Sequence, residues 1–384
     1  MSEWKDGYFL DYIELNPKVS LKKGDWYPFV DMASVDSVTR IPTCFEQKQY
    51  TSGVKFQKLD TVFARIEPCL QNGKRFLFKD FLYGFGSTEF LVFRAIKDKT
   101  VPLFVYYYMQ THRIKNIMIN SMTGATGRQR VNNDVFNHLI IKIPSLSIQT
   151  RVSEILSRYD ALIENYQKQI KLLEESAQRL YKEWFVDLRF PGHENTKIEN
   201  GVPEGWEKKN ITELADVHYG YTFDGKLFNS DKVGIPIARI RNIPDGYTND
   251  YTTEEASNDY IVKNGDILVG MDGIFHINTW CGGDAYLVQR TCLFRPKNEI
   301  LKGFIFQAIK GPIKVFEQIL VGATVAHLGK KHIDSIELIM PKDFHLYKPL
   351  NNLFFYRQEL LNQIRFLVEA RDRLLPRLMN GELL

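Results

Sequence analysis

Two long stretches of the chain carry apolar residues at alternating spacings of three and four, with very few helix breakers. The first runs from Arg151 to Asp187 without Gly or Pro, and breakers follow at Pro191-Gly192. The second lies near the C-terminus and keeps the same spacing. This pattern is close to a heptad seam, so each stretch is predicted to form a long helix, roughly 50 Å long for the first. The predicted seam residues are Leu162, Tyr166, Leu173, Leu180, Leu360, Ile364, Leu367 and Leu374.

Two seams of similar length in one chain favour an antiparallel coiled coil, because pairing buries both apolar faces at once. The alternative is a single long amphipathic helix that docks on a globular domain. In either case the helices are predicted to be rigid elements between more compact parts of the chain.

The same short motifs occur twice, in the same order. Gly124-Ala125-Thr126 precedes an apolar alternation ending at Pro144, and Gly322-Ala323-Thr324 precedes one ending at Pro341. These alternations around Ile141 and Leu338 predict strands. The repeat extends to three further pairs of segments: Leu59–Phe63 with Gly265–Val269, Glu89–Arg94 with Arg290–Arg295, and Gln169–Leu173 with Gln363–Leu367. We interpret the chain as a tandem duplication.

Dense Gly and aromatic residues in 60–130 and 215–325 favour β-rich domains with long loops. The predicted fold class is therefore α+β, with two β-rich domains separated by two long antiparallel helices. We expect a first domain at 1–145, a first spacer helix at 146–190, a second domain at 191–342 and a second spacer helix at 343–384.

The composition is that of an ordinary globular protein, with 44% hydrophobic and 25% charged residues in 384. The sequence contains no run of about 18 apolar residues, so we expect no transmembrane helix. The N-terminal residues do not resemble a signal peptide. Four cysteines, Cys44, Cys69, Cys281 and Cys292, form no CxxC pair. We therefore expect neither a disulfide framework nor a cysteine zinc site, and a reducing cytoplasm as the compartment.

The formal charge is uneven along the chain. Residues 1–145 carry 20 basic and 14 acidic side chains, whereas residues 191–342 carry 17 basic and 20 acidic ones. Residues 146–190 carry 7 of each sign, as expected for a rod that faces protein. The first domain is thus suited to a polyanion, and the second can bind one only if its basic residues gather on one face.

Motifs of catalysis are missing from the sequence. There is no P-loop, no HExxH, no Gly-x-Ser-x-Gly and no Asn-Pro-Pro-aromatic motif of amino-methyltransferases. His327 and His332 lack a third metal ligand in register and are interpreted as surface residues. We expect no catalytic residue and no bound metal or cofactor in this chain.

Several motifs, taken together and in this order, resemble the DNA-specificity subunit (HsdS) of type I restriction–modification systems over nearly the whole chain. The C-terminal string is the most specific of them. The motifs are Gly124–Val131, Gln149 with Ile155-Leu156, Trp184-Phe185-Val186, Pro203-Glu204-Gly205-Trp206-Glu207, Gly265–Leu268 and Leu374–Leu383.

This resemblance implies a protein without catalytic activity of its own. It implies two target-recognition domains that each read one half of a bipartite, asymmetric DNA site. The helices would set the unread spacer and dock two copies of a methyltransferase subunit, which binds S-adenosylmethionine and modifies adenine at N6. A translocase–nuclease subunit would join for restriction.

Candidate DNA-binding residues are basic, amide or aromatic side chains in predicted loops and strand ends. Arg128-Gln129-Arg130 follow Gly124 and Gly127, whose freedom allows close approach, and Arg and Gln suit guanine and adenine edges. Alternation predicts that Arg239 and Arg241 share one face of a strand. The other candidates are Arg65, Lys74, Arg75, Tyr219, Tyr221, Asn242, His276, Lys330 and Lys331.

Two other functional classes stay open on the sequence alone. The chain could be a stand-alone methyltransferase or nuclease with an unrecognised site, and S-adenosylmethionine binding would favour that. It could instead be an adaptor whose two domains bind protein, and DNA binding insensitive to salt would favour that. A silent specificity subunit that never assembles is a variant of the first interpretation.

Overall fold

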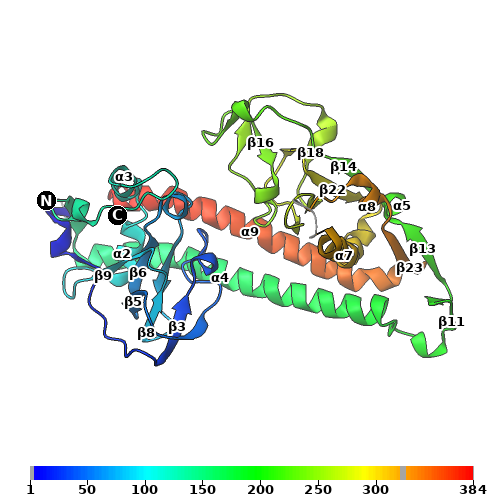
Figure 1. Ribbon diagram of the computed structural model, residues 1–384, viewed down its shortest axis with the longest axis horizontal. Helices are drawn as coiled ribbons and strands as arrows, with labels where there is room; N and C mark the ends of the chain where they lie inside the picture. The colour runs from blue at the N-terminus through cyan, green and yellow to red at the C-terminus, as the bar shows by residue number, and fades with distance from the viewer. Residues whose placement is uncertain (1–3, 321–325, 384) are drawn as a thin grey trace. The chain divides into compact units, whose positions relative to one another are not determined.

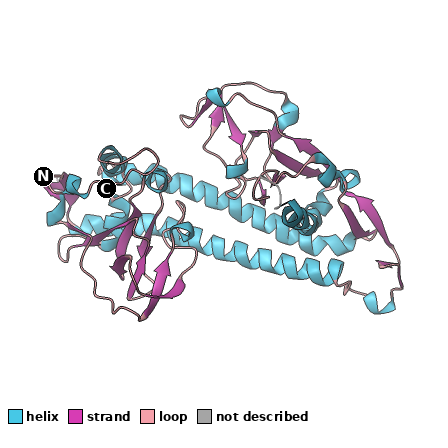
Figure 2. Cartoon of the chain, in the orientation of Figure 1, coloured by secondary structure: helices cyan, strands magenta, loops and turns pink. Residues whose placement is uncertain are grey.

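The computed structural model describes residues 4–320 and 326–383, which form two compact units. Unit 1 combines the chain up to Asn165 with the chain from Phe366 onward, and unit 2 spans Tyr166–Arg365. Figure 2 shows strands in both globular parts, together with two long helices. The fold is α+β with two β-rich domains, as predicted.

The first domain, in unit 1, contains two four-stranded sheets. The first sheet has the order β2-β9-β6-β7 and the second β4-β3-β8-β5 (Figure 1). The strands are β1 (Trp4–Tyr8), β2 (Ile13–Leu15), β3 (Trp26–Val30), β4 (Glu46–Gln49), β5 (Val54–Gln57), β6 (Asp60–Ala64), β7 (Arg75–Phe78), β8 (Tyr83–Gly86), β9 (Phe90–Ala95) and β10 (Ile140–Pro144). Strand β1 pairs antiparallel with β10. The helices are α1 (Glu67–Gln71), α2 (Pro102–Tyr108) and α3 (His112–Asn120).

The second domain, in unit 2, repeats this plan with a four-stranded sheet β14-β22-β19-β20 and a five-stranded sheet β15-β17-β16-β21-β18. The first group of strands is β11 (Ile198–Glu199), β12 (Val202–Pro203), β13 (Trp206–Asn210), β14 (Ala215–Tyr219), β15 (Phe228–Asn229), β16 (Ile235–Ala238) and β17 (Tyr251–Thr252). The second group is β18 (Ile261–Val262), β19 (Ile267–Gly270), β20 (Ile277–Thr279), β21 (Ala285–Leu287), β22 (Thr291–Pro296) and β23 (Glu337–Pro341). The helices are α5 (Ile211–Leu214), α6 (Lys302–Ala308), α7 (Lys310–Leu320) and α8 (Lys330–Asp334).

One buried ion pair occurs at the same place in both domains and supports the duplication. In the first domain, the Arg94 guanidinium donates to both carboxylate oxygens of Asp60, each at 2.7 Å. In the second, Arg295 donates through Nε to Asp266 at 2.9 Å. The first pair joins β6 to β9, and the second joins the start of β19 to β22. These are the segments that the sequence repeat matches. The Gly322-Ala323-Thr324 copy of the repeat lies outside the described residues.

The two long helices are α4 (Leu146–Tyr181), followed by a π-helical turn at Lys182–Val186, and α9 (Lys348–Met379) (Figure 1). Their first and last turns help to build the cores of the domains. Leu156 and Leu378 belong to the core of unit 1, and Ala177 and Phe354 to the core of unit 2. None of the helices within 4–320 and 326–383 combines the length and the apolar character needed to cross a membrane.

Within each unit, a segment of α4 contacts a segment of α9. In unit 1, the Asp160 carboxylate of α4 accepts a hydrogen bond from Arg371 of α9 at 2.7 Å. In unit 2, Glu174 accepts from Arg357 at 2.6 Å, and Gln169 accepts from the Tyr356 hydroxyl at 3.1 Å. Late residues of α4 thus meet early residues of α9, so the helices are antiparallel.

Among the predicted seam residues, Leu162 lies on the exposed side of α4 rather than in a seam. Leu162 is 36% exposed, whereas the neighbouring Ile163 is fully buried. The buried face of this part of α4 also includes Asp160 and Glu164, whose polar partners lie in the first domain. Because the predicted seam counted only apolar positions, it was rotated away from this face. Tyr166, Leu173, Leu180, Ile364, Leu367 and Leu374 are partly buried, and Leu360 is 3% exposed.

Candidate nucleic-acid interface

The predicted recognition loop of the first domain is a tight, well-anchored turn. Thr123 and Arg130 exchange two backbone hydrogen bonds of 3.0 Å, which close the loop. Within it, Gly124 and Gly127 adopt φ values of 121° and 77°, which side chains other than glycine rarely tolerate. The Gly127 amide donates to the Glu67 carboxylate at 3.0 Å, so the start of α1 holds the loop. This geometry leaves the Arg128 side chain exposed at the surface.

Arg130 forms an ion pair with Glu89, a residue that the sequence analysis did not single out. Its guanidinium donates to Glu89 through Nε at 2.8 Å and through NH2 at 2.7 Å. These hydrogen bonds hold the pKa of Glu89 below its ordinary value. Arg65 joins the two segments, since its amide donates to the Glu89 carbonyl and its carbonyl accepts from the Val131 amide. Arg65 and Arg130 therefore lie close together, with Glu89 between their segments, a grouping that the sequence analysis did not predict.

Lys74 and Arg75 lie apart from this cluster, on the return strand. Arg75 is 8% exposed, and its guanidinium donates to the carbonyls of Ser37 and Gly73. The prediction that Arg75 contacts DNA is wrong, because the side chain is buried and its Nη1 donates to two backbone carbonyls inside the domain. Lys74 donates to the Met32 carbonyl at 2.8 Å and is partly buried.

The second domain has an equivalent cluster beside α8. Leu328 donates its amide to the Met271 carbonyl at 2.8 Å, and the His327 ring lies 2.6 Å from the Asp272 carboxylate. Arg290 approaches the same carboxylate to 3.2 Å. Lys330 and Lys331 are exposed at the start of α8, close in sequence to this cluster. Both lysines thus lie just after the cluster in the chain, where the first domain has the 3-10 turn Asn133–Phe136 that follows its loop.

The two predicted tyrosines fall in different surroundings. Tyr219 ends β14, and the Lys330 ammonium lies 5.8 Å from the centre of its ring. Tyr221 packs instead against Phe223 and Tyr260 in the core of the five-stranded sheet. Of these two residues, the structure associates Tyr219 alone with the lysines of α8.

The predicted strand face at Arg239 and Arg241 is wrong. Strand β16 ends at Ala238, and Ile240–Asn242 form a 3-10 turn that the Asn242 side chain caps by accepting from the Arg239 amide at 3.0 Å. Arg241 and Asn242 both donate to Asp250. The local capping bond competes with strand extension, which alternation alone does not reveal. These residues form a separate polar group around Asp250.

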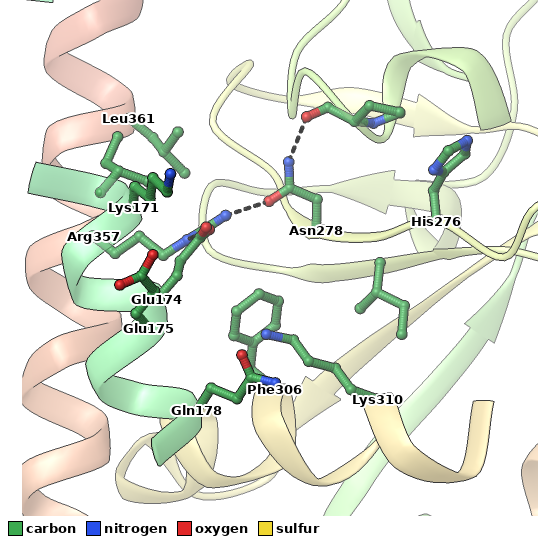
Figure 3. A pocket seen from close by; sticks show the side chains of 13 residues that line it. Lys171, Glu174, Glu175, Gln178, His276, Asn278, Phe306, Lys310, Arg357 and Leu361 are labelled. Carbon is green, nitrogen blue, oxygen red and sulfur yellow. Dashed lines mark hydrogen bonds and ion pairs between the residues drawn. The ribbon is translucent and has the colours of Figure 1, made fainter. Parts of the chain in front are cut away.

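His276 lines a cleft of about 600 Å³ in unit 2 rather than the loop cluster. Figure 3 shows Arg357 reaching from α9 to Asn278, and Lys310 lying beside Phe306. Burial lowers the pKa of Lys310 to about 8. The cleft combines carboxylates of α4 with basic groups of α7 and α9, so its charge is mixed.

The sequence analysis missed Glu89, Asp272 and Arg290, and it set His327 aside. The sequence contained a signal for two of them, because Glu89 and Arg290 are the first residues of two segments that the repeat matches. Among the described residues, no group of three or more His, Cys, Asp or Glu side chains is arranged to hold a metal ion.

Comparison with known proteins supports the family resemblance that the sequence motifs indicated. The model of the type I restriction modification DNA specificity domain matches residues 15–175 and again 203–345. The type I restriction enzyme MjaIX specificity subunit of Methanocaldococcus jannaschii is 26% identical over 314 residues, which cover 75% of this chain and 70% of that protein. The HindI specificity subunit of Haemophilus influenzae is 24% identical, with 85% and 87% covered.

A solved structure supports the fold. The S subunit of the type I restriction–modification system from M. genitalium superposes with a TM-score of 0.54 at 15% identity, covering 98% of this chain and 95% of that one. The family model occurs twice, once in each half of the duplicated chain, and spans well over half of its residues. The chain therefore belongs to the family of type I restriction–modification DNA-specificity subunits, whose role is DNA recognition rather than catalysis.

Proposed function

We propose that the two β-rich domains each read one half of a bipartite, asymmetric DNA site. The observation that carries this proposal is the equivalent position of the Ile66–Arg130 bridge and the Asp272–His327 bridge in two domains of one duplicated fold. Equivalent positions with different side chains suit two readers that dock alike and recognise different bases. Base edges are distinguished by donors and acceptors in the major groove, which is what Arg, Gln and carboxylate side chains supply.

The long helices would set the distance between the two half-sites. Two weak half-site readers gain affinity when their separation is fixed, because the second contact becomes intramolecular. Helix α4 is 36 residues long, follows the last strand of the first domain in the chain and precedes the strands of the second. It contains no Gly or Pro. A continuous helix resists bending far better than a Gly/Ser linker.

As a type I specificity subunit, the chain has DNA, methyltransferase and restriction subunits as partners. We infer further that two methyltransferase copies dock on the helices, that they bind S-adenosylmethionine, and that this chain binds none. The complex would act in the cytoplasm, on the chromosome. The methyltransferase must take its target adenine out of the helical stack, and a subunit that grips DNA on both sides holds the duplex for that step.

The proposal is tested by methylome sequencing of cells that express this chain with its methyltransferase partner, compared with cells expressing the partner alone. A bipartite N6-methyladenine motif that depends on this chain is the expected result. No new motif and no complex by size-exclusion chromatography would contradict the proposal. S-adenosylmethionine binding by the purified chain would favour a stand-alone enzyme, and DNA binding that does not weaken with salt would favour an adaptor.

The same assay tests the recognition loop. We expect Arg128→Ala to change base preference in one half of the motif and to leave the other half and the spacer unchanged. An unaltered motif would contradict the assignment of this loop.

A further inference from the structure

Three backbone positions of the first domain are tied together by a short set of hydrogen bonds. The Arg65 amide donates to the Glu89 carbonyl at 2.8 Å, and the Val131 amide donates to the Arg65 carbonyl at 3.0 Å. Next to these bonds, Ile66 and Arg130 form an isolated antiparallel bridge. Residues 66, 89 and 130 therefore meet at one corner of the sheet.

The second domain repeats this set of bonds. The Met271 amide donates to the Arg290 carbonyl at 2.8 Å, and the Leu328 amide donates to the Met271 carbonyl at 2.8 Å. Asp272 and His327 form the matching antiparallel bridge. Position 272 is thus equivalent to 66, position 290 to 89, and position 327 to 130.

The side chains at these equivalent positions differ in charge between the two domains. In the first domain the carboxylate is Glu89 and the guanidinium is Arg130, at 2.7 Å from each other. In the second domain the guanidinium, Arg290, occupies the position of the carboxylate. The carboxylate there, Asp272, occupies the position that is apolar in the first domain. Each domain keeps one carboxylate with donor groups beside it, but at different points of the same scaffold.

Stability does not account for these groups. The Arg130 side chain is 44% exposed and that of Arg290 is 56% exposed. Ion pairs at such exposure contribute little to folding because water screens them and side-chain entropy opposes them. Their common place beside the Gly124–Arg130 loop and beside Lys330 instead puts them on the surface that we propose meets DNA.

We propose that positions 66, 89 and 130, and their equivalents 272, 290 and 327, form a reading triplet in each domain that contacts base edges. An Arg guanidinium pairs with guanine O6 and N7, and a carboxylate accepts from the amino group of cytosine. Because the carboxylate and the guanidinium occupy different positions in the two triplets, the same docking of each domain presents a different donor and acceptor pattern. The asymmetry of the target then originates in the charge arrangement of the two triplets. This inference rests on the proposed function.

The test is selection of binding sites from a library of random duplex DNA by the full-length chain and two neutral variants, Glu89→Gln and Arg290→Gln. Each variant is expected to change the selected bases in one half of the motif only, and the two variants in opposite halves. Discrimination at the affected position should fall by about 5- to 100-fold. The slope of affinity against salt should stay unchanged, because a base contact neutralises no phosphate.

Glu46→Gln and Lys208→Gln are matched controls. Each makes the same kind of charge change at an exposed ion pair of the same domain, with Lys48 and Glu337 respectively. The controls should select the wild-type motif. Far-UV circular dichroism checks that all variants fold.

Two results would overturn the reading triplet while leaving the proposed function in place. One is an unchanged motif in both variants. The other is a uniform loss of affinity at every sequence for Arg290→Gln with a shallower salt slope, which is the mark of a phosphate contact. Failure of the wild-type chain to select any bipartite motif would overturn the proposed function itself, and the triplet with it.

Discussion

Arg371 of α9 and Asp160 of α4 form an ion pair that is almost completely removed from water. Their side chains are 3% and 1% exposed, and the NH1–Oδ1 distance is 2.7 Å. Asp160 also accepts a hydrogen bond from the Tyr107 hydroxyl, and Arg371 donates to the Val38 carbonyl at 2.9 Å. Burial alone would lower the pKa of Arg371, but Asp160 and Asp372 together more than compensate and raise it. The pair therefore joins both long helices to the first domain.

Arg371→Met removes the cation and leaves Asp160 charged in a dry site. Loss of one partner from a buried pair costs about 3–5 kcal/mol, because the remaining charge has no compensation. The Val38 carbonyl also loses its donor, which adds about 1 kcal/mol. We therefore expect unit 1 to lose about 4–6 kcal/mol. The double variant Asp160→Asn with Arg371→Met should recover at least about 2 kcal/mol, since its neutral amide still accepts from Tyr107.

The assay is native-state hydrogen exchange at the amides of α2, because a chain with two units does not give one global free energy of unfolding. Arg373→Met is the control, since Arg373 is 78% exposed in its pair with Glu369, and we expect it to change stability by at most about 0.5 kcal/mol. An effect below about 1 kcal/mol for Arg371→Met, or no recovery in the double variant, would refute the reasoning.

Three further predictions concern the second domain and the helices. Gly220→Ala places a methyl group 2.0 Å from the Val288 carbonyl oxygen and should lower the melting temperature of unit 2, whereas Gly225→Ala, with no atom within 4 Å, should not. Burial lowers the pKa of Lys310 from 10.5 to about 8, so the unfolded chain binds more protons between these values and stability should rise with pH there. Lys310→Met should abolish that rise and stabilise the protein at pH 7 by about 1–3 kcal/mol; an unchanged pH profile of the melting temperature would contradict this. Insertion of one heptad into both α4 and α9 adds about 10 Å and should lengthen the unread spacer by about three base pairs with both half-sites kept; altered half-sites with an unchanged spacer in the methylome would contradict it.

The long helices and the duplication were predictable because their signals are local. Spacing of three and four without breakers specifies a helix whatever it packs against. The strands around Ile141 and Leu338 follow from alternation, and both pair with early strands of their own domain. The Asp60–Arg94 pair recurs at Asp266 because the repeat preserves both members.

The candidate site was less predictable, because burial and pairing depend on residues far away in the chain. Arg75 is withdrawn from the surface by the Ser37 carbonyl, 38 residues earlier. Arg130 is held by Glu89, 41 residues away, through a bond that no local pattern contains. The strand predicted at Arg239 failed for a local reason, since Asn242 offers a cap that stops the strand. The basic residues could thus be found from the sequence. The sequence could not show which of their side chains remain available at the surface to contact DNA.

The composition of unit 1 has a consequence for how the protein is made. Its core includes Leu378 and Met379, which follow the whole of unit 2 in the chain. During synthesis the second domain, whose core extends to Phe354 in α9, can therefore close its core while the first still waits for the last turns of α9. A chain that stopped inside α9 would leave the first core without Leu378 and Met379, whereas the second core would already be complete.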